Sequence, residues 1–315
     1  MPEPILIVSN LPAAMTLRLE RHYDVLDAGM SAPIEAFGRQ QLSRVRALVT
    51  LGGPKLSESL LNDLPSLGAI VCYGTGYNGI DMDSVSSRRI VVGNSPGANA
   101  TAVAELAMAL MLAVTRRIVP SDRYVRAGGW AAARASPVAK LQSGLAGRRV
   151  GIYGLGEIGR KFAARAAAFE TEVAYFSRRK MDVPYAYMHS LAALVEWCDI
   201  LIISVRAGND THHAIGAEML SRLGRSGYII NISRGTVIDQ RALLAALSEG
   251  TIAGAGLDVY ETEPHSPDAL TALQNVVLTP HTGSDTIEAH EAMQGCVIAN
   301  LDAFYAGLPL PYGVN

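Results

Sequence analysis

Residues 149–159 read RVGIYGLGEIG, and this stretch decides the fold. Positions 149–153 form a short apolar run typical of a buried strand, and a Gly-x-Gly-x-x-Gly turn follows directly. Good helix formers fill positions 161–169, and a second strand is expected over 172–176. Strand, glycine turn, helix and strand in this order predict one βαβ unit of the dinucleotide-binding kind.

Each of the three glycines has a separate role in such a unit. Gly154 allows the tight turn, Gly156 lets a pyrophosphate approach the backbone, and Gly159 lets helix and strand pack closely. The amino end of the helix offers free N–H groups and a partial positive charge to the same pyrophosphate. We therefore expect a dinucleotide to bind here.

The end of the second strand predicts which nicotinamide dinucleotide binds. An acidic residue there hydrogen-bonds the ribose 2′-hydroxyl of NAD, whereas an Arg accommodates the 2′-phosphate of NADP. This chain has Ser177 in the acidic position, followed by Arg178 and Arg179. A solvated basic strand end is the other interpretation of the two arginines. The missing acid favours NADP, with NAD as the alternative.

Length and composition narrow the classes of protein. The 315 residues fit two domains, and 49% of them are apolar, enough for sizeable cores. A net charge of −2 argues against nucleic acid or an anionic membrane as a partner. The three cysteines lack C-x-x-C spacing, which favours reduced thiols. No basic signal-peptide region opens the chain, and the longest apolar run, 102–114, is too short to cross a bilayer, so we expect a cytoplasmic protein.

The rest of the chain alternates strands and helices. Strands are expected near 5–8, 47–51, 69–73, 90–93, 198–204, 228–232, 253–259 and 276–279. The pattern predicts an α/β fold with two Rossmann-like or flavodoxin-like parallel-sheet domains and an active-site cleft between them. A last helix over 287–307 is long enough to return to the first domain. We place a discontinuous substrate-binding domain at 1–97 and 287–315, and a dinucleotide-binding Rossmann domain of five or six parallel strands at 98–286.

Two other motifs compete with this interpretation. Residues 73–79 also form a Gly-x-Gly-x-x-Gly after a strand, but they lack the long helix and predict an anion-holding loop. Residues 93–97 match the Gly-x-Ser-x-Gly nucleophile elbow of hydrolases. Because Pro96 has no N–H for an oxyanion hole, the hydrolase alternative is excluded.

A long apolar helix is expected over 99–118, closed by Arg116-Arg117 and Pro120. A helix that is apolar on most faces must be buried between domains or between subunits. Trp130 lies on the arm that follows. We expect this arm to pack against a second copy of the chain.

Three polar residues follow strands of the dinucleotide-binding half. Arg234 can hold a substrate carboxylate with two parallel hydrogen bonds. His281 can protonate the alkoxide that forms when a ketone is reduced, and Glu263 would stabilise the protonated imidazole. Singly, each has an ordinary alternative: a surface arginine, a loop charge, and a packing or helix-capping histidine. Together with a dinucleotide site they predict hydride transfer to a keto acid.

No metal site is predicted. His212 and His213 are adjacent, so their side chains are expected to point to different sides of the backbone. No Cys or carboxylate near them completes a ligand set.

These residues resemble the D-isomer-specific 2-hydroxyacid dehydrogenases, and within them the glyoxylate/hydroxypyruvate reductases. The resemblance covers essentially the whole chain and rests on the glycine motif and on residues 233–235, 257–259, 263–264 and 280–284. It implies that NADPH reduces a small 2-keto acid, such as glyoxylate or hydroxypyruvate, to the D-2-hydroxy acid. It also implies a homodimer.

The resemblance implies a role for each matching residue. Arg234 would bind the substrate carboxylate and polarise the carbonyl, with His281 as the acid/base and Glu263 as its partner. Asp258 would bind the nicotinamide carboxamide, and Thr75 with Gly76 would hold the carboxylate through N–H groups. The predicted substrate-binding residues are Gly52, Thr75, Gly76, Arg234 and Ser284. The predicted cofactor-binding residues are Thr101, Gly154, Leu155, Gly156, Glu157, Ile158, Gly159, Ser177, Arg178, Arg179, Val205, Arg206, Ile232, Ser233, Asp258, His281 and Gly283.

Two positions depart from the family pattern. Arg206 stands where many members have a proline, either as a further phosphate contact or as a solvated charge. Ala133 stands where some reductases carry a second aromatic residue three positions after Trp130, which leaves the substrate size open. The alternatives are a reductase of a larger 2-keto acid, like phenylpyruvate or 2-ketogluconate, a dinucleotide-sensing co-regulator, or a methyltransferase that would leave Arg234, Glu263 and His281 unexplained.

Overall fold

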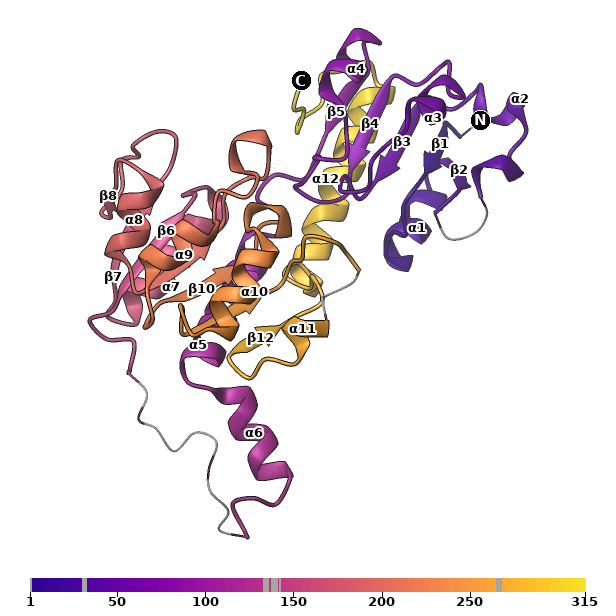
Figure 1. Ribbon diagram of the computed structural model, residues 1–315. Helices are drawn as coiled ribbons and strands as arrows, with labels where there is room; N and C mark the ends of the chain where they lie inside the picture. The colour runs from indigo at the N-terminus through magenta and orange to yellow at the C-terminus, as the bar shows by residue number, and fades with distance from the viewer. Residues whose placement is uncertain (1, 30–32, 133–135, 137–140, 142, 265–267) are drawn as a thin grey trace. The chain divides into compact units, whose positions relative to one another are not determined.

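The computed structural model describes residues 2–29, 33–132, 136, 141, 143–264 and 268–315. The chain divides into two compact units (Figure 1). Unit 1 comprises Met1–Asn99 with Asp285–Asn315, and unit 2 comprises Ala100–Ser284. The first crossing follows residue 99 rather than the expected 97, and the second precedes residue 285 rather than the expected 287.

Unit 1 is built on a five-stranded sheet in which every pairing is parallel. Its strands are β1 (Pro4–Ile7), β2 (Asp24–Asp27), β3 (Ala47–Thr50), β4 (Ala69–Cys72) and β5 (Val91–Gly93), in the order β2-β1-β3-β4-β5. Sequence analysis missed β2. This edge strand has no fully buried residue, so it lacks the apolar run that marks its neighbours.

The helices of unit 1 are α1 (Ala13–Glu20), α2 (Arg39–Leu42), α3 (Glu58–Asn62), α4 (Met82–Ser87) and α12 (Ile287–Tyr305). The last helix returns from unit 2 and packs against β4, as expected for a discontinuous domain. Its buried apolar face repeats every four residues, through Ala289, Met293, Val297 and Leu301. The Thr286 hydroxyl caps its amino end by accepting a hydrogen bond from the Ala289 N–H.

Unit 2 contains a seven-stranded, all-parallel sheet. Its strands are β6 (Arg149–Tyr153), β7 (Glu172–Phe176), β8 (Ala186–Tyr187), β9 (Ile200–Ile203), β10 (Tyr228–Asn231), β11 (Gly254–Leu257) and β12 (Val276–Leu278), in the order β12-β11-β10-β9-β6-β7-β8. The expectation of five or six strands was wrong because β8 is only two residues long, too short for a periodic signal. The predicted α/β class with two parallel-sheet domains is confirmed.

The strand order reverses at β6. This strand pairs with β7 on one side and with β9 on the other, although β9 follows β7 in the chain. The glycine motif begins directly after Tyr153, at the carboxyl end of β6. In open parallel sheets a ligand binds where neighbouring connections diverge in this way.

Helices cover both faces of this sheet (Figure 1). On one face α5 (Ala100–Thr115) packs against α7 (Glu157–Ala168), β10 and β11, with Met111 and Phe162 fully buried. The other face carries α8 (Leu191–Trp197), α9 (Ala217–Leu223) and α10 (Gln240–Ser248), through Leu194, Leu220 and Leu243. A further short helix, α11 (Asp268–Thr271), precedes β12. Within the residues described, no helix is both long and apolar enough to cross a membrane.

The expected helix over 99–118 is α5, which ends just before Arg116-Arg117 as predicted, and a second helix that was not expected follows it. α5 ends at Thr115, and Arg117 takes a left-handed backbone (φ 51°), which separates α5 from α6 (Ile118–Arg126). Pro120 therefore does not close a helix; it lies in the first turn of α6, where its missing N–H removes no helical hydrogen bond.

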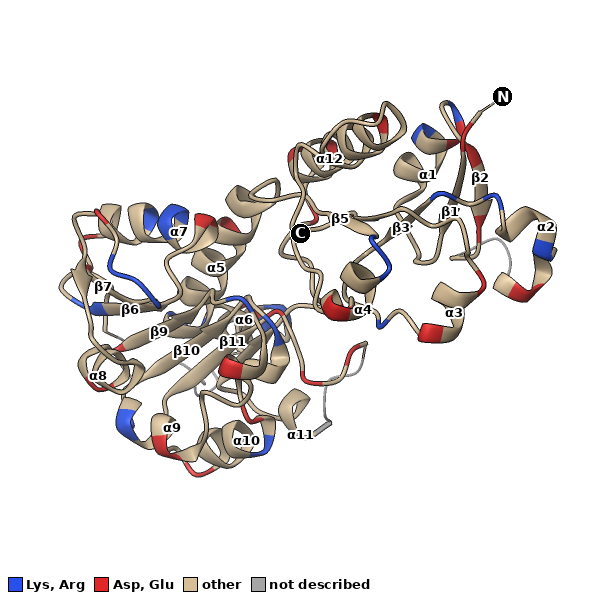
Figure 2. Cartoon of the chain, turned by 90° about the horizontal axis from the view of Figure 1, so that it is seen from above, with Lys and Arg blue, Asp and Glu red and all other residues tan. Residues whose placement is uncertain are grey.

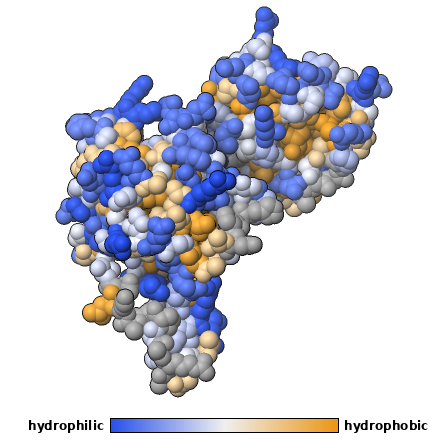
Figure 3. Space-filling view, viewed as in Figure 1, coloured by the Kyte–Doolittle hydropathy of each residue, from blue (hydrophilic) through white to orange (hydrophobic). Residues whose placement is uncertain are grey.

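Helix α6 stands out from unit 2 (Figures 1 and 3). None of its residues is buried, and large apolar side chains on this arm face solvent: Ile118 and Val125 are 51% exposed and Trp130 is 73% exposed. Elsewhere, acidic and basic residues are interspersed over both units (Figure 2), in keeping with a net charge of −2.

Candidate active site

Three predicted site residues follow three neighbouring strands of unit 2. Arg234 follows β10, Glu263 follows β11 and His281 follows β12. These strands are adjacent and parallel, so their carboxyl ends lie at one edge of the sheet. The topology therefore brings the three loops together, as expected from the sequence.

His281 and Glu263 form a hydrogen-bonded pair. The Nδ1 atom of His281 lies 2.7 Å from Oε2 of Glu263, and both side chains are partly exposed. The other carboxylate oxygen, Oε1, accepts the Tyr260 N–H at 3.0 Å. His281 takes a left-handed backbone (φ 57°), so the chain holds this ring in a conformation that non-glycine residues seldom adopt.

Glu263 is held as a carboxylate. Partial burial alone would raise its pKa, because a low-polarity environment disfavours the charge. The hydrogen bonds from His281 and Tyr260, together with the positive charges of His281 and Arg234, outweigh burial and hold the pKa of Glu263 below its usual 4.5. Glu263 can therefore accept a hydrogen bond from His281 throughout the neutral range.

Arg234 is mostly buried, and its guanidinium interacts electrostatically with the carboxylate of Glu263. Burial lowers the pKa of its guanidinium, and the negative charge of Glu263 opposes this shift. Its Nη1 donates to the carbonyl oxygen of Ser233 at 2.7 Å. The guanidinium has five N–H donors in a planar fork, a geometry that suits a carboxylate.

Sequence analysis missed Asn231, which holds the Arg234 loop. This side chain is 1% exposed; its Nδ2 donates to the Arg234 carbonyl oxygen (3.0 Å), and its Oδ1 accepts the Ser233 N–H (3.1 Å). A polar residue at the last position of an otherwise apolar strand was the available signal. Such a residue is buried only when its hydrogen bonds are satisfied.

Asp258 holds the loop that carries His281. Its carboxylate is 2% exposed and accepts hydrogen bonds from the Thr279 hydroxyl (2.7 Å) and from the N–H groups of Thr282 and Gly283 (both 2.9 Å). The Tyr260 hydroxyl adds a bond to the Thr279 carbonyl oxygen (2.9 Å). Sequence analysis assigned Asp258 to the nicotinamide carboxamide and did not foresee this structural role, nor those of Thr279 and Tyr260.

The glycine motif fits a dinucleotide. Gly154 has a φ of 97°, and a Cβ there would lie 2.6 Å from the Val205 Cα; a Cβ on Gly159 would lie 2.3 Å from the Gly154 oxygen. A side chain at either position would therefore clash with the protein's own backbone, whether or not a ligand is bound. A Cβ on Gly156 would meet no atom within 4 Å, so the space there is open, as the approach of a pyrophosphate requires.

Two N–H groups at the start of α7 are available to an anion. Within the part of the chain that the structure describes, Glu157 and Ile158 N–H donate to no acceptor. Leu155 differs, because its N–H donates to the Ser177 hydroxyl oxygen at 2.9 Å. Ser177 thus joins the end of β7 to the glycine loop.

Arg178 and Arg179 are exposed directly after β7. Neither contacts a carboxylate among the described residues, so their charges are not neutralised by a protein partner. On the other side of β6, Val205 and Ser233 are joined by a hydrogen bond from the Ser233 hydroxyl to the Val205 carbonyl oxygen. Ile232 is buried, whereas Arg206 is exposed.

The remaining substrate candidates lie in unit 1. A Cβ on Gly52 (φ 80°) would lie 2.1 Å from the Gly76 oxygen, so the loops after β3 and β4 are in contact. The Thr75 hydroxyl donates either to the Ser95 carbonyl oxygen (3.0 Å) or to Asn99 Oδ1 (3.1 Å). The N–H groups of Thr75 and Gly76 find no acceptor among the residues described. With respect to the described residues, the backbone donors rather than the hydroxyl are therefore available to a carboxylate.

The remaining predicted positions differ in their exposure to solvent. Thr101 is exposed in the first turn of α5, Gly283 is buried beside Asp258, and Ser284 is half-buried. Ala133 lies outside the described residues. The expectation for the adjacent histidines was wrong: the rings of His212 and His213 stack, with centroids 4.0 Å apart.

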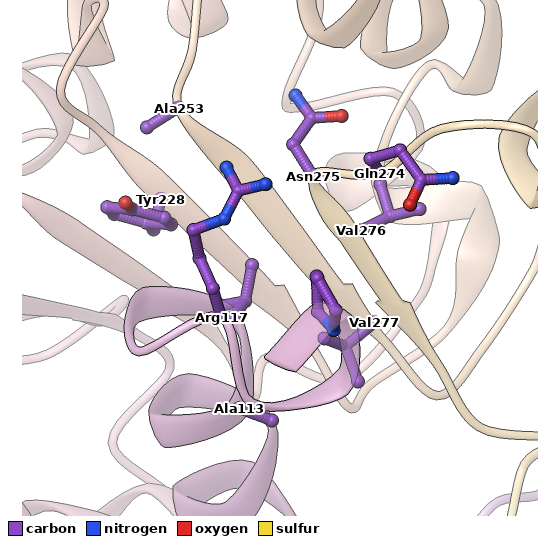
Figure 4. A pocket seen from close by; sticks show the side chains of 10 residues that line it. Ala113, Arg117, Tyr228, Ala253, Gln274, Asn275, Val276 and Val277 are labelled. Carbon is purple, nitrogen blue, oxygen red and sulfur yellow. The ribbon is translucent and has the colours of Figure 1, made fainter. Parts of the chain in front are cut away.

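A pocket in unit 2 lies at the opposite end of the sheet (Figure 4). Its lining includes the first residues of β10 and β12 and the residue before β11, so it belongs to the amino-terminal edge. The Arg117 side chain points into it, toward the space between Tyr228 and Asn275. None of the predicted site residues lines this pocket, so it is separate from the candidate active site.

Comparisons with known proteins agree with this geometry. Residues 108–283 match the family model "D-isomer specific 2-hydroxyacid dehydrogenase, NAD binding domain". Glyoxylate reductase from Thermococcus litoralis is 38% identical and covers 100% of this chain and 97% of its own. Hydroxyphenylpyruvate reductase from Plectranthus scutellarioides is 40% identical over 86% of this chain and 85% of its own.

A solved structure extends the likeness to the whole fold. NADPH-dependent glyoxylate/hydroxypyruvate reductase from Sinorhizobium meliloti, in complex with NADP and malonate, superposes with a TM-score of 0.92 and is 33% identical. The match covers 100% of this chain and 97% of that one. The chain therefore belongs to the D-isomer-specific 2-hydroxyacid dehydrogenase family, and it is an oxidoreductase that uses a nicotinamide dinucleotide.

Proposed function

We propose that the protein reduces a small 2-keto acid, such as glyoxylate or hydroxypyruvate, to the D-2-hydroxy acid with NADPH. The observation that carries the proposal is the pairing of His281 with Glu263 beside Arg234, at the sheet edge that also bears the glycine motif. The names of the relatives support the same substrate class.

Each charged residue has one task in this reaction. When bound, the reduced nicotinamide supplies a hydride to the keto carbon. Arg234 binds the substrate carboxylate and polarises the carbonyl through its guanidinium N–H groups. His281 gives a proton to the carbonyl oxygen as it becomes an alkoxide, a contribution of about 10²–10⁴ in rate.

The pairing with Glu263 selects the nitrogen that carries out the transfer. Because Nδ1 of His281 lies against Glu263, Nε2 is the ring nitrogen left for the substrate. Glu263 stabilises the imidazolium before transfer, and its own low pKa keeps the proton on the histidine rather than on the carboxylate. Reduction thus takes one hydride from the cofactor and one proton from His281.

The preference for NADPH rests on the end of β7. Arg178 and Arg179 are exposed there with no carboxylate partner in the described part of the chain, and no acid occupies the position of Ser177. A 2′-phosphate carries about −1.5 to −2 charges, which two guanidinium groups attract and a carboxylate would repel. Arg206 is a further candidate for this phosphate.

The substrate carboxylate is also the proposed ligand of the unit 1 loop. The N–H groups of Thr75 and Gly76, which meet no acceptor in the described part of the chain, suit an anion of this size. Gly52, whose loop contacts Gly76, and Ser284 are the other proposed substrate-binding residues.

The protein is proposed to act as a homodimer. The arm that includes α6 exposes Ile118, Val125 and Trp130, and a second copy that covers them would remove this apolar surface from water. A symmetric dimer presents the same arm on both chains.

Oxidation of NADPH and of NADH, followed at 340 nm with glyoxylate, hydroxypyruvate, phenylpyruvate and 2-ketogluconate, tests the proposal. We expect the two small acids with NADPH to give the highest kcat/KM. Faster turnover of phenylpyruvate would favour the larger-substrate alternative, which the 40% identity to a hydroxyphenylpyruvate reductase supports. Nucleotide binding without oxidation of either cofactor would favour a co-regulator instead.

A further inference from the structure

His213 makes a contact that the proposed reaction does not use. Its Nε2 lies 2.7 Å from Oε1 of Glu261, and about a third of each side chain is exposed. His213 follows the 3₁₀ turn η2 (Asn209–Thr211) after β9, whereas Glu261 lies in the loop after β11. The contact therefore joins two loops that are 48 residues apart in the chain.

The backbone at His213 is also unusual. It has a φ of 49°, so this histidine shares the left-handed region with His281. The ring of His212 stacks on that of His213 at 4.0 Å, which limits the directions that the imidazole can take. A non-glycine residue persists in this conformation only when its surroundings hold it there.

His213 reaches both catalytic loops at once. Its side chain contacts Glu261, two positions before Glu263, and its N–H donates to the carbonyl oxygen of Thr236 at 2.8 Å. Thr236 lies in η3 (Gly235–Val237), the turn that begins directly after Arg234. One residue thus connects the loop of the substrate-binding guanidinium with the loop of the carboxylate.

The loop after Arg234 and the loop that carries Glu263 pack tightly against each other. A Cβ on Gly235 would lie 1.8 Å from the Tyr260 carbonyl carbon and 2.2 Å from the Glu261 nitrogen, so the backbones are in direct contact. The Glu261 N–H also donates to Oε1 of Gln240 at 3.3 Å. A shift of Glu261 would therefore move Tyr260, whose N–H holds Glu263.

We infer that His213 and Glu261 are a positioning pair, which fixes Glu263 and Arg234 relative to one another; this inference rests on the proposed function. Neither residue belongs to the Arg234, Glu263 and His281 set. The pair acts through the placement of Glu263 against His281, and a small displacement of a catalytic group has a large effect on rate.

The variant that tests the pair is His213→Asn. Asparagine tolerates the left-handed backbone, so the loop can keep its conformation, but its side chain is too short to reach Glu261. Glu261→Ala removes the other partner, and Glu261→Gln retains an acceptor oxygen. The matched control is Glu218→Ala, which breaks the exposed pair with Arg222 (2.9 Å) on α9.

We expect His213→Asn and Glu261→Ala each to lower kcat with glyoxylate and NADPH by about tenfold, and the double variant to lower it no further, because both remove one coupled contact. The alkaline limb of the kcat/KM profile should move to lower pH, since a displaced Glu263 stabilises the imidazolium less. Glu261→Gln should restore most of kcat. The KM for NADPH should stay at the wild-type value in all of these variants. The control Glu218→Ala should keep wild-type activity.

Hydrogen–deuterium exchange gives a second readout that needs no turnover. Peptides covering 234–237 and 258–264 should exchange faster in His213→Asn than in the wild type, and Glu218→Ala should leave them unchanged. Unchanged exchange, or additive losses of kcat without a shift of the pH profile, would overturn the inference. A wild type that oxidises neither cofactor would instead refute the proposed function, and exchange would still decide whether the pair holds the loops.

Discussion

The Nδ1 atom of His281 lies 2.7 Å from Oε2 of Glu263, and the opposite oxygen of that carboxylate accepts the Tyr260 N–H. Both oxygens of Glu263 are therefore engaged, one by the ring and one by the backbone. In the proposed reaction this carboxylate orients the imidazole, and Nε2 is the ring nitrogen that serves the substrate. The roles proposed for these residues can be tested by the pH dependence of activity, by KM for the keto acid and by the free energy of unfolding of variants.

The Glu263→Gln variant should narrow the pH range of reduction. Glutamine keeps the size and one acceptor oxygen but loses the charge that stabilises the imidazolium. We expect the alkaline limb of kcat/KM with glyoxylate and NADPH to move to lower pH, with kcat at neutral pH reduced about ten- to a hundredfold. A profile identical to that of the wild type would contradict the role assigned to this carboxylate.

The same pair gives stability a defined pH dependence. The pKa of Glu263 is held below 4.5 in the folded protein, so its ionised form stabilises the fold above about pH 4.5, and this contribution is lost as the pH falls through the lowered pKa. The difference in free energy of unfolding between wild type and Glu263→Gln should therefore be larger at pH 7 than at pH 3. Urea unfolding at the two pH values measures it.

Arg234→Lys should raise KM for the keto acid and also lower kcat. Lysine keeps the positive charge but cannot form two parallel hydrogen bonds to a carboxylate. We expect kcat/KM to fall by about 10²-fold, the loss of one bidentate charged contact at about 2.7 kcal/mol. Steady-state kinetics measures both constants; Arg225→Lys, an exposed position before β10, is the control and should match the wild type.

Ser177→Asp combined with Arg178→Ala should move the cofactor preference toward NADH. The new carboxylate repels a 2′-phosphate and can accept from a ribose 2′-hydroxyl, and it can still accept the Leu155 N–H that Ser177 binds now. We expect the ratio of kcat/KM for NADPH over NADH to fall by at least about tenfold. A wild type that is already faster with NADH would defeat the prediction.

Asn231→Ala should destabilise unit 2 and disturb the Arg234 loop. The buried amide satisfies the Ser233 N–H and the Arg234 carbonyl oxygen, and alanine leaves both without this partner. The expected cost is about 1–3 kcal/mol in the free energy of unfolding. Urea unfolding followed by circular dichroism measures it, and the exposed Asn209→Ala is a control expected to change little.

Trp130→Ser with Val125→Ser should weaken the proposed dimer. Both side chains face solvent on the arm, and covering them in a dimer would contribute about 1.5–3 kcal/mol each. We expect a dimeric wild type by sedimentation, and a dissociation constant at least about a hundredfold higher in the double variant. Leu17→Ser, at a position on α1 that is 56% exposed, is the control. A monomeric wild type at micromolar concentration would contradict the proposal.

Local pattern was sufficient for much of the fold. The strand, glycine turn, helix and strand from Arg149 to Phe176 were predicted in place, because apolar runs and glycines at fixed spacing act over a few residues. The two missed strands, β2 and β8, are edge strands without a fully buried residue, so their sequences lack the apolar run that marks a buried strand. The long helix ends just before Arg116-Arg117, as predicted, but the helix that follows, α6, was missed because the left-handed turn between the two helices falls on a non-glycine residue, Arg117.

By itself, the sequence determined the parallel α/β architecture, the glycine motif and the identity of the charged residues that follow the strands. Only the tertiary structure decided which atoms meet: His281 Nδ1 with Glu263 Oε2, Asp258 with the loop of His281, and His213 with Glu261. The physical reason is the distance along the chain over which each kind of interaction acts. Strand and helix signals arise from neighbours in the chain, whereas these hydrogen bonds join residues 18 to 48 positions apart and depend on the order in which the strands pair.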